Sequence, residues 1–447
     1  MSNITSRIDR LPVTPMLKKI LLLTGIGWMF DAMDQGMVAG VMAAIGKDWA
    51  LTTGQLGLLG SSGMLGMALG AALSGMAADR WGRRNVIIGT LIIYGIASGL
   101  SGFALNYPML LALRFLTGFG LGGELPAAAT LVSEYSPTRI RGRNVILLES
   151  FWAWGWIAAA LVAYLLIPMY GWRIAFWVGA IPAIFAAYLR KAIPESPRYL
   201  ENAGRIQEAG VLVSQMEKQA GINEIFEIQH DEKDCKDKSK RVSFIDLWSK
   251  KYFKSTIVLW TIWFGINLGY YGFVLWTPTL LMDKGFDLVR SFQFTLIMCL
   301  AQLPGYFSAA YLVEKIGRKK VLSGYFAGTA LAAWLFGHAG STNEVLLFGC
   351  LLYFFSLGAW GCVYAYTPEV YPTAARATGM GWAAAFGRLG AFSAPLIVPV
   401  LYKAYGTETG YTYVFIMLTT VFAIVALIVA LLGKETMGKS LEEISGE

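Results

Sequence analysis

The sequence predicts an all-helical integral membrane protein with twelve transmembrane helices arranged as two six-helix bundles. Three observations predict it: long uncharged stretches, an uneven distribution of Lys and Arg, and an internal repeat. Of the 447 residues, 56% are hydrophobic and 15% are charged, whereas soluble proteins carry about 25% charged residues. No Asp, Glu, Lys or Arg occurs in residues 85–113, 345–368 or 409–433. Because an apolar stretch of about 18 residues predicts a membrane span, a soluble enzyme and a nucleic-acid-binding domain are excluded.

Apolar stretches bounded by charged and turn-forming residues give the spans in chain order. They cover residues 18–46, 54–78, 85–105, 107–135, 143–168, 172–193, 254–283, 291–313, 320–340, 343–367, 376–401 and 410–433. An even number places both termini on one side, and Lys and Arg mark the cytoplasmic side. The loops of the opposite side hold few of the 37 basic residues, namely Lys47, Arg173, Lys284, Arg290 and Lys403. We therefore expect a multi-pass protein of the cell membrane with both termini in the cytoplasm.

A polar segment and a repeat divide the chain. We expect an N-terminal bundle over residues 1–193, a cytoplasmic linker with short helices over 194–253, and a C-terminal bundle with a cytoplasmic tail over 254–447. An offset of 235 residues superposes the halves, aligning Trp28 with Trp263, Gly82 with Gly317, Arg83 with Arg318, Glu134 with Glu369 and Arg141 with Arg376. Parallel repeats with a site at their interface are typical of proteins that work by alternating access.

Two repeated charged loops face the predicted cytoplasmic side. The loop after the second span reads Gly75-x-x-x-Asp79-Arg80-x-Gly82-Arg83-Arg84, and its counterpart reads Glu314-Lys315-x-Gly317-Arg318-Lys319. An acid at a helix end can meet the positive N-terminus of a neighbouring helix, and the arginines can reach other acids. We interpret the set as a cytoplasmic gate: Asp79, Arg80, Arg83, Glu134, Arg141, Glu314, Arg318, Glu369 and Arg376. Ordinary basic flanking of membrane spans is the alternative.

Several charged residues fall inside predicted spans, where each costs about 2.5–3.5 kcal/mol on insertion scales and indicates function. Asp31 and Asp34 lie three residues apart, on one face of the first helix. A carboxylate that pairs with arginine when ionised can link transport to protons. The proton-coupling candidates are Asp31, Asp34, Arg114 and Glu124. For Asp34 and Arg114, the alternative is a structural ion pair that holds the first and fourth helices together. For Glu124, the alternative is a hydrogen bond to backbone groups of a locally irregular helix.

Arg388 lies near the middle of the eleventh span, and its planar guanidinium suits a carboxylate. Aromatic side chains beside polar groups could sandwich a flat ring. The substrate-binding candidates are Arg388, Trp28, Trp152, Trp263, Asn267, Tyr270, Tyr271, Gln302, Trp360, Tyr364 and Glu149. The alternative for Arg388 is a salt bridge to Glu149 or a bond to a backbone carbonyl.

The remaining chemistry is sparse. The chain has two histidines, four cysteines without metal-ligand spacing, no nucleophile–base constellation and no phosphate-binding loop. We expect no enzymatic activity, no cofactor, no metal site and no nucleic-acid partner.

The Gly75 to Arg84 loop is the signature of the major facilitator superfamily, which the sequence resembles over essentially its whole length. Pro194-Glu-Ser-Pro-Arg-Tyr-Leu200 and Arg114-x-x-x-Gly118 are similar to the branch that contains sugar porters and organic-ion transporters. However, Thr261-Ile262 stand where a sugar porter carries a Gln-Gln pair. That difference argues against recognition of sugar hydroxyls.

A closer resemblance is to the bacterial niacin transporters, which are related to aromatic-acid:proton symporters and synaptic-vesicle-protein-like transporters. It is carried by Gly27-Trp-Met-Phe-Asp-Ala-Met-Asp34, Gly122-Gly-Glu-Leu-Pro126, Glu149-Ser-Phe-Trp152, Ala301-Gln-Leu-Pro-Gly-Tyr-Phe-Ser308, Leu357-Gly-Ala-Trp-Gly361 and Tyr364-Ala-Tyr-Thr-Pro-Glu369. The resemblance implies a monomeric secondary transporter in the lipid bilayer that imports nicotinate, or also nicotinamide, together with protons. It also implies that Asp34, partnered by Arg114, matches the proton-coupling acid of related symporters.

Three alternatives stay open at this point. The first is a proton symporter for another aromatic carboxylate such as benzoate. The second is a membrane receptor that transports nothing, against which stands the lack of a sizeable soluble output domain. The third is an exporter of cationic drugs, which would favour an anionic cavity over the central positive charge of Arg388.

Overall fold

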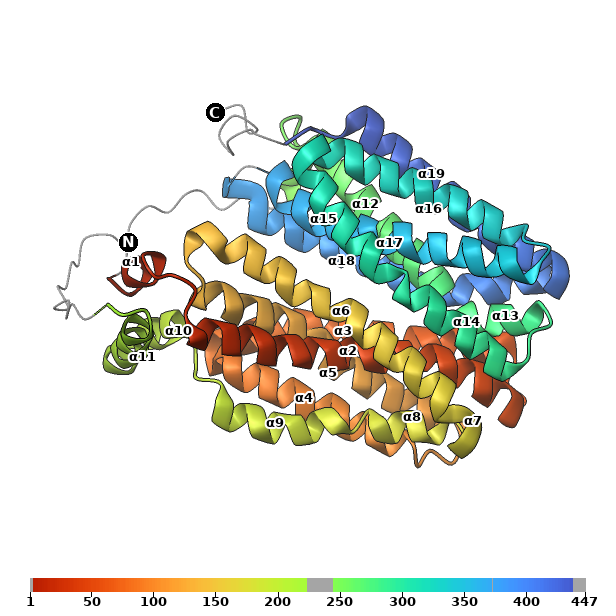
Figure 1. Cartoon of the computed structure of the whole chain (residues 1–447), viewed down its shortest axis with the longest axis horizontal. Helices are drawn as coiled ribbons and strands as arrows, with labels where there is room; N and C mark the ends of the chain where they lie inside the picture. The colour runs from red at the N-terminus through yellow and green to blue at the C-terminus, as the bar shows by residue number, and fades with distance from the viewer. Residues whose placement is uncertain (1–2, 223–243, 372, 437–447) are drawn as a thin grey trace. The chain divides into compact units, whose positions relative to one another are not determined.

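The computed structural model describes residues 3–222, 244–371 and 373–436, and over these residues it consists of helices and connecting turns without a strand. Figure 1 shows the helices in chain order. The predicted all-helical class is therefore confirmed. Residues 223–243 of the expected linker lie outside the described residues.

The helices of the first half follow the predicted spans closely. They are α2 (Pro15–Asp48), α3 (Thr53–Trp81), α4 (Arg83–Ser101), α5 (Tyr107–Tyr135), α6 (Thr138–Leu165), α7 (Ile167–Tyr170), α8 (Arg173–Val178) and α9 (Ile181–Ala192). The predicted sixth span, residues 172–193, is formed by α8 and α9 together. Pro182 lies in the first turn of α9, where proline is tolerated because the N–H groups of that turn have no partner within the helix.

The second half contains α12 (Phe253–Val274), α13 (Thr277–Asp283), α14 (Leu288–Leu300), α15 (Gln302–Ile316), α16 (Arg318–Gly337), α17 (Thr342–Val370), α18 (Thr373–Tyr405) and α19 (Thr407–Leu432). Two predicted spans are again pairs of helices. Pro278 lies in the first turn of α13, and Pro304 lies near the start of α15. Each proline interrupts the backbone hydrogen bonding that would have continued the preceding helix.

Short helices lie in the expected linker and at the start of the chain: α1 (Asn3–Asp9), α10 (Pro197–Asn202), α11 (Ile206–Gln219) and the 3-10 helix η1 (Ile245–Trp248). Figure 1 shows α1 beside α10 and α11. A small apolar core that includes Ile8, Leu200 and Val213 joins these three helices. Arg7 reinforces the contact, because its guanidinium lies 2.6 Å from the Glu217 carboxylate.

Glycine in α3 permits very close helix packing. A Cβ atom added at Gly70 would lie only 1.9 Å from the Phe119 carbonyl oxygen of α5, and one added at Gly66 would lie 2.1 Å from the Phe115 carbonyl oxygen. Small residues of this kind allow backbones to approach inside membranes. The glycine content of α3 thus brings α3 against α5, the helix that carries Arg114.

Packing divides the chain into two compact units. The first comprises residues 1–34, 65–155 and 176–238, and the second comprises residues 35–64, 156–175 and 239–447. The second unit therefore includes parts of α2, α3 and α6. The division of the repeat at residues 193 and 254 stays a prediction.

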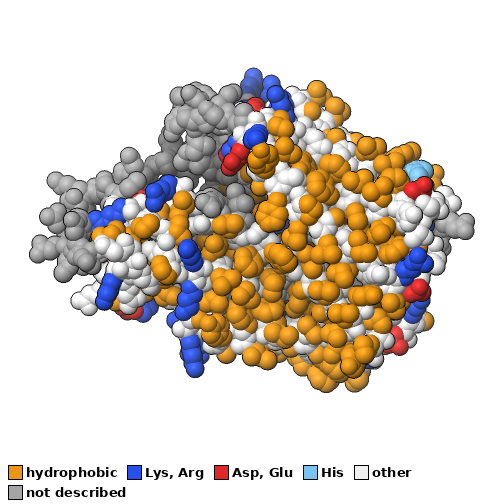
Figure 2. Space-filling view, viewed as in Figure 1, with side chains coloured by type: hydrophobic (Ala, Val, Ile, Leu, Met, Phe, Trp, Pro, Cys, Tyr) orange, Lys and Arg blue, Asp and Glu red, His pale blue; other side chains and the backbone are white. Residues whose placement is uncertain are grey.

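The surface of the helices agrees with a lipid environment. Large apolar side chains such as Ile184, Val400 and Leu431 are more than 60% exposed. On the face shown in Figure 2, apolar side chains form a broad field and charged side chains gather at its margins. Within the described residues, nine helical segments are long and apolar enough to cross a membrane. Three predicted spans, within α2, α3 and α16, are not among these segments, and the count of twelve stays a prediction.

Candidate functional site

An ion pair between Asp34 of α2 and Arg114 of α5 lies in the first unit. An Arg114 nitrogen lies 2.9 Å from the Asp34 carboxylate, and the two side chains are 3% and 1% exposed. The Ser98 hydroxyl donates to the other carboxylate oxygen at 2.5 Å. Arg114 also donates to the Thr117 hydroxyl at 2.8 Å and covers the ring of Phe176. Both carboxylate oxygens of Asp34 therefore have partners, and its charge is compensated.

Asp31, one turn earlier on α2, is in the opposite situation. Its side chain and that of Glu124 on α5 are completely buried, and Glu124 and the Tyr94 hydroxyl are its polar neighbours. None of the four carboxyl oxygens of Asp31 and Glu124 makes a well-formed hydrogen bond to a described residue. The Glu124 carboxyl lies against the backbone of Gly27, where an added Cβ would lie 2.2 Å from its oxygen. The structure thus brings two predicted acids together without a described cation between them.

A second group in the first unit combines two predicted aromatics with an acid. The rings of Trp28 and Trp152 lie 4.9 Å apart at 37°. Glu149 is 6% exposed and is a neighbour of the Trp28 indole, whose N–H makes no hydrogen bond to a described residue. Trp28 is three residues before Asp31, so these two side chains lie on one face of α2.

The predicted aromatics of α12 and α17 lie together in the second unit. The Trp360 and Tyr364 rings stack at 5.7 Å and 27°, and the Trp263 ring meets Tyr364 edge-on at 5.7 Å. The Trp263 indole donates to the Thr367 hydroxyl at 3.1 Å, which fixes its orientation. Asn267 donates to the Trp263 carbonyl at 2.8 Å. One N–H of the Asn267 amide is therefore occupied by its own helix.

The other polar candidates of the second unit differ in their hydrogen-bond partners. The Tyr271 hydroxyl donates to the Gln35 side chain at 3.3 Å. Tyr270 packs edge-on against Trp360 at 6.1 Å. Gln302, the first residue of α15, is fully buried, and neither polar atom of its amide has a hydrogen-bond partner among the described residues. Gln302 therefore retains donor and acceptor capacity for a ligand.

Arg388 of α18 lies near Tyr271 of α12. It is partly exposed and within electrostatic reach of the Tyr271 hydroxyl. Its neighbour Gly387 brings α18 against α12, since an added Cβ would lie 2.8 Å from the Asn267 amide nitrogen. Within the second unit, no described carboxylate lies within ion-pair distance of Arg388. Its positive charge is therefore uncompensated there.

The repeated charged loops form matching ion pairs, one in each unit. Arg83 lies 3.2 Å from Glu134, and Arg318 lies 3.2 Å from Glu369. These are equivalent residues of the two halves, so the repeat extends to side-chain contacts.

The other expected gate residues have different surroundings. Arg141 lies 4.0 Å from Asp9 of α1. Arg80 and Glu314 are exposed. The side chains of Asp79 and Arg376 lie outside what the structure describes.

Comparison with known proteins places this arrangement in a family. Residues 29–447 match the family described as "Sugar (and other) transporter". The chain belongs to this family of the major facilitator superfamily. It is a multi-pass membrane transporter and not an enzyme.

Two relatives and one solved structure show the extent of the similarity. The chain is 49% identical to the "Niacin transporter NiaP" of Acinetobacter baylyi over 99% of both chains. It is 43% identical to the "Putative niacin/nicotinamide transporter NiaP" of Bacillus subtilis over 95% of this chain and 98% of the relative. Among solved structures, the partially occluded, inward-open xylose transporter XylE from E. coli is similar with a TM-score of 0.75 at 18% identity, covering 95% of this chain and 99% of XylE. The last similarity confirms the major facilitator fold.

Two acids of this transporter were missed by the sequence analysis. Glu195 accepts hydrogen bonds from the backbone N–H groups of Arg83 and Arg84 at 3.1 and 3.2 Å, at the N-terminus of α4. Glu435 accepts from the backbone of Arg318 at 2.8 Å, at the N-terminus of α16. Carboxylates at these positions satisfy free N–H groups and the helix dipole. The sequence contained a signal for this role. Each acid follows the last membrane helix of its half and stands directly before a hydroxyl residue, Ser196 or Thr436.

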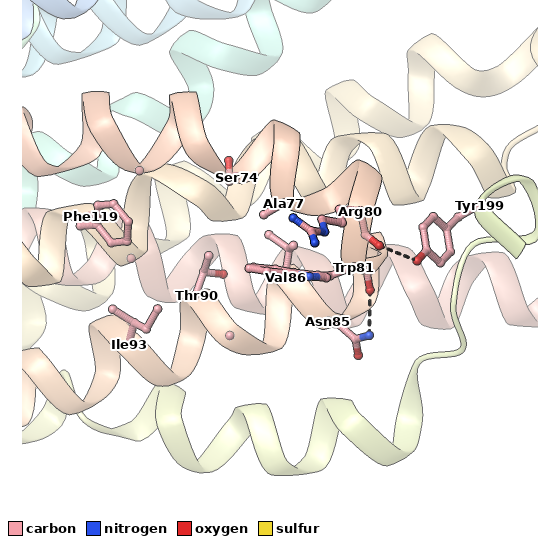
Figure 3. Close-up of a pocket in the computed structure, with 13 residues that line it drawn as sticks. Ser74, Ala77, Arg80, Trp81, Asn85, Val86, Thr90, Ile93, Phe119 and Tyr199 are labelled. Carbon is pink, nitrogen blue, oxygen red and sulfur yellow. Dashed lines mark hydrogen bonds between the residues drawn. The ribbon is translucent and has the colours of Figure 1, made fainter. Parts of the chain in front are cut away.

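A groove in the first unit of the transporter is separate from these groups. It lies between α3, α4 and α5 in the first unit, with a volume of about 650 Å³ (Figure 3). Small residues such as Thr90 and apolar residues such as Phe119 line most of it. The Tyr199 hydroxyl donates to the Arg80 carbonyl at one end. None of the expected substrate-binding residues lines this groove, so it is not the predicted substrate site.

Proposed function

We propose that this transporter imports niacin across the cytoplasmic membrane by alternating access, driven by protons and acting as a monomer. The observation that carries the proposal is the 49% identity, over nearly the whole chain, to a protein named as a niacin transporter. A second relative at 43% identity is named for niacin and nicotinamide. The alternatives of a receptor and of a cationic-drug exporter have no comparable support.

Arg388 is the proposed receptor for the carboxylate of nicotinate. Its guanidinium has no carboxylate partner within its unit, and a bidentate bond to the substrate would supply one. The aromatic group of Trp263, Trp360 and Tyr364 is suited to stacking on a pyridine ring. Gln302, with its unoccupied amide, can donate to the ring nitrogen.

We infer that the buried charged residues of the first unit make transport depend on protons, either by carrying the proton or by holding α2 against α5 as a fixed ion pair. Asp31, Asp34, Glu124 and Arg114 are all 3% exposed or less. Uncompensated charge is costly at this depth, so a change in protonation alters the stability of the surrounding helices. This gives protons a way to bias the conformational cycle.

The repeated ion pairs Arg83–Glu134 and Arg318–Glu369 are the proposed cytoplasmic gate. Each links residues more than 50 positions apart within one unit. The side chains are 12% exposed in the first pair and 23% and 26% exposed in the second, so solvent reaches both pairs. Water can therefore replace the partner of each charge when a pair separates during the transport cycle.

Binding by purified protein tests the cargo. Nicotinate should raise the unfolding temperature more than benzoate or a hexose does, because a ligand that binds the native state stabilises it. Arg388→Lys keeps the charge but loses the planar fork, and it should weaken nicotinate binding at least about tenfold. Lys403→Ala, an exposed change on the same helix, is the matched control and should bind as the wild type does. Unchanged binding by Arg388→Lys and Arg388→Ala would remove Arg388 from the site.

Benzoate remains the second candidate, because the guanidinium and the aromatic rings suit any flat carboxylate. Gln302 separates the two cargoes, since benzoate has no ring nitrogen. Gln302→Leu should reduce nicotinate binding and leave benzoate binding unchanged. A wild-type protein that prefers benzoate would favour the alternative cargo.

A further inference from the structure

The two acids of α2 that share one helical face have opposite surroundings. Asp34 is bonded to Arg114 at 2.9 Å and to Ser98 at 2.5 Å, so both of its oxygens are satisfied as a carboxylate. Asp31 faces another acid, Glu124, and no described residue donates a well-formed hydrogen bond to either. The two acids are therefore suited to different protonation states.

The groups that face Asp31 come from three helices. Glu124 lies on α5, Tyr94 lies on α4, and Asp34 lies on α2 itself. None of these groups is positively charged, and Arg114 is already bonded to Asp34. Two buried carboxylates without a cation repel each other, so the pair stably holds at least one proton.

A glycine on α2 allows the Glu124 carboxyl group to lie against that helix. Gly27 leaves room for the Glu124 carboxyl, since any Cβ there would collide with its oxygen at 2.2 Å. Gly27 and Asp31 are four residues apart and lie on one face of α2. The contact surface of α2 thus holds the Glu124 carboxyl next to Asp31.

We propose that Asp31 and Glu124 share the coupled proton and form the proton-carrying site, whereas Asp34 and Arg114 form a fixed ion pair that does not take up this proton. In the step, one carboxylate oxygen binds a proton from water to become a carboxyl, which donates a hydrogen bond to the remaining carboxylate. Release returns the proton to water, and no other bond changes. The inference deepens the proposed function and depends on its proton-driven part.

The Asp31–Glu124 pair can affect the cargo because Asp31 lies close to an aromatic candidate for substrate binding. Trp28 lies one turn before Asp31 on the same face of α2 and packs on Trp152 at 4.9 Å. Loss of the proton leaves two charges one turn from this aromatic pair. Repulsion between them favours a different packing of α2 on α5, which moves Trp28.

Transport by proteoliposomes separates the roles, because exchange of labelled for unlabelled nicotinate needs no driving force whereas accumulation does. Asp31→Asn and Glu124→Gln imitate the protonated state, and each should keep exchange within about twofold of the wild type. Each should lose at least about tenfold of the accumulation driven by an inward proton gradient. Gly27→Ala, which displaces the Glu124 carboxyl, should lower accumulation in the same way. Size-exclusion profiles identify variants that fold.

Direct proton counting gives a second measurement in the same protein. Binding of nicotinate to the wild type, measured by calorimetry in buffers of different ionisation enthalpy, should transfer protons. That transfer should disappear in Glu124→Gln.

Three results would overturn the assignment. The first is proton-driven accumulation at the wild-type level in both Asp31→Asn and Glu124→Gln. The second is an Asp34→Asn protein that exchanges normally but no longer accumulates. The third is accumulation driven by sodium instead of protons. If the wild-type protein imports nicotinate but ignores the proton gradient, the proton-driven part of the proposed function fails as well.

Discussion

Asp34→Asn should destabilise the protein far more than Asp31→Asn, although the two acids lie one turn apart on α2. Asparagine at position 34 would leave the Arg114 guanidinium, 3% exposed, without its counter-ion. Asparagine at position 31 removes no ion pair, because the Asp31 carboxyl has no described cation partner. The two substitutions are chemically identical, so each is the control for the other.

The size of the difference follows from the burial of the ion pair. Removing one partner of a buried pair costs about 3–5 kcal/mol. At about 2 °C per kcal/mol for a large chain, Asp34→Asn should lower Tm by about 6–10 °C. Asp31→Asn should stay within about 2 °C of the wild type, because it leaves no uncompensated charge. Adding Arg114→Gln to Asp34→Asn should restore part of the loss, since the unpaired charge is then removed.

Thermal unfolding of the purified protein in detergent, followed by tryptophan fluorescence, measures these shifts. Equal Tm values for Asp34→Asn and Asp31→Asn would refute the reasoning. So would an Asp34→Asn/Arg114→Gln double variant whose loss equals the sum of the single losses.

Three further predictions concern other contacts. Although burial raises the pKa of Glu217, hydrogen bonds from Arg7 and Arg10 outweigh this and hold that pKa below its ordinary value. The docking of α1 on α11 should therefore be fully stabilised above about pH 4.3, the pKa of an unfolded glutamate, and weaken as the pH falls below it. Hydrogen exchange of α1 should show this, and Glu217→Gln should exchange faster at neutral pH. Gly70→Ala should lower Tm by several degrees, because its Cβ would collide with the backbone of α5. Glu195→Gln should lower the free energy of unfolding by about 0.5–1 kcal/mol, because it weakens the cap of α4. An unchanged unfolding temperature in Gly70→Ala or Glu195→Gln would contradict the reasoning for that variant.

The helices could be predicted from the sequence because hydropathy decides which segments enter the membrane. Residues 107–135 were predicted as a span and are the helix α5. The breaks in other spans were missed, although Pro182, Pro278 and Pro304 mark them. An apolar stretch remains apolar across a proline, so hydropathy alone does not resolve the interruption.

The site could be predicted in composition but only partly in arrangement. Asp34 and Arg114 were identified as members of one coupling group, and they form an ion pair. The pairing of Asp31 with Glu124 could not be predicted, because it depends on the close approach of α2 and α5 at Gly27. Glu195 was missed since its capping role depends on how the chain folds back after α9. Local sequence does not encode such contacts between distant segments.

Uptake of labelled nicotinate by the purified transporter in liposomes tests the central claim most directly. The account predicts accumulation above the external concentration when the inside is alkaline, collapse on addition of a protonophore, and competition by unlabelled nicotinate stronger than by benzoate. Uptake no greater than in liposomes without protein would contradict the account.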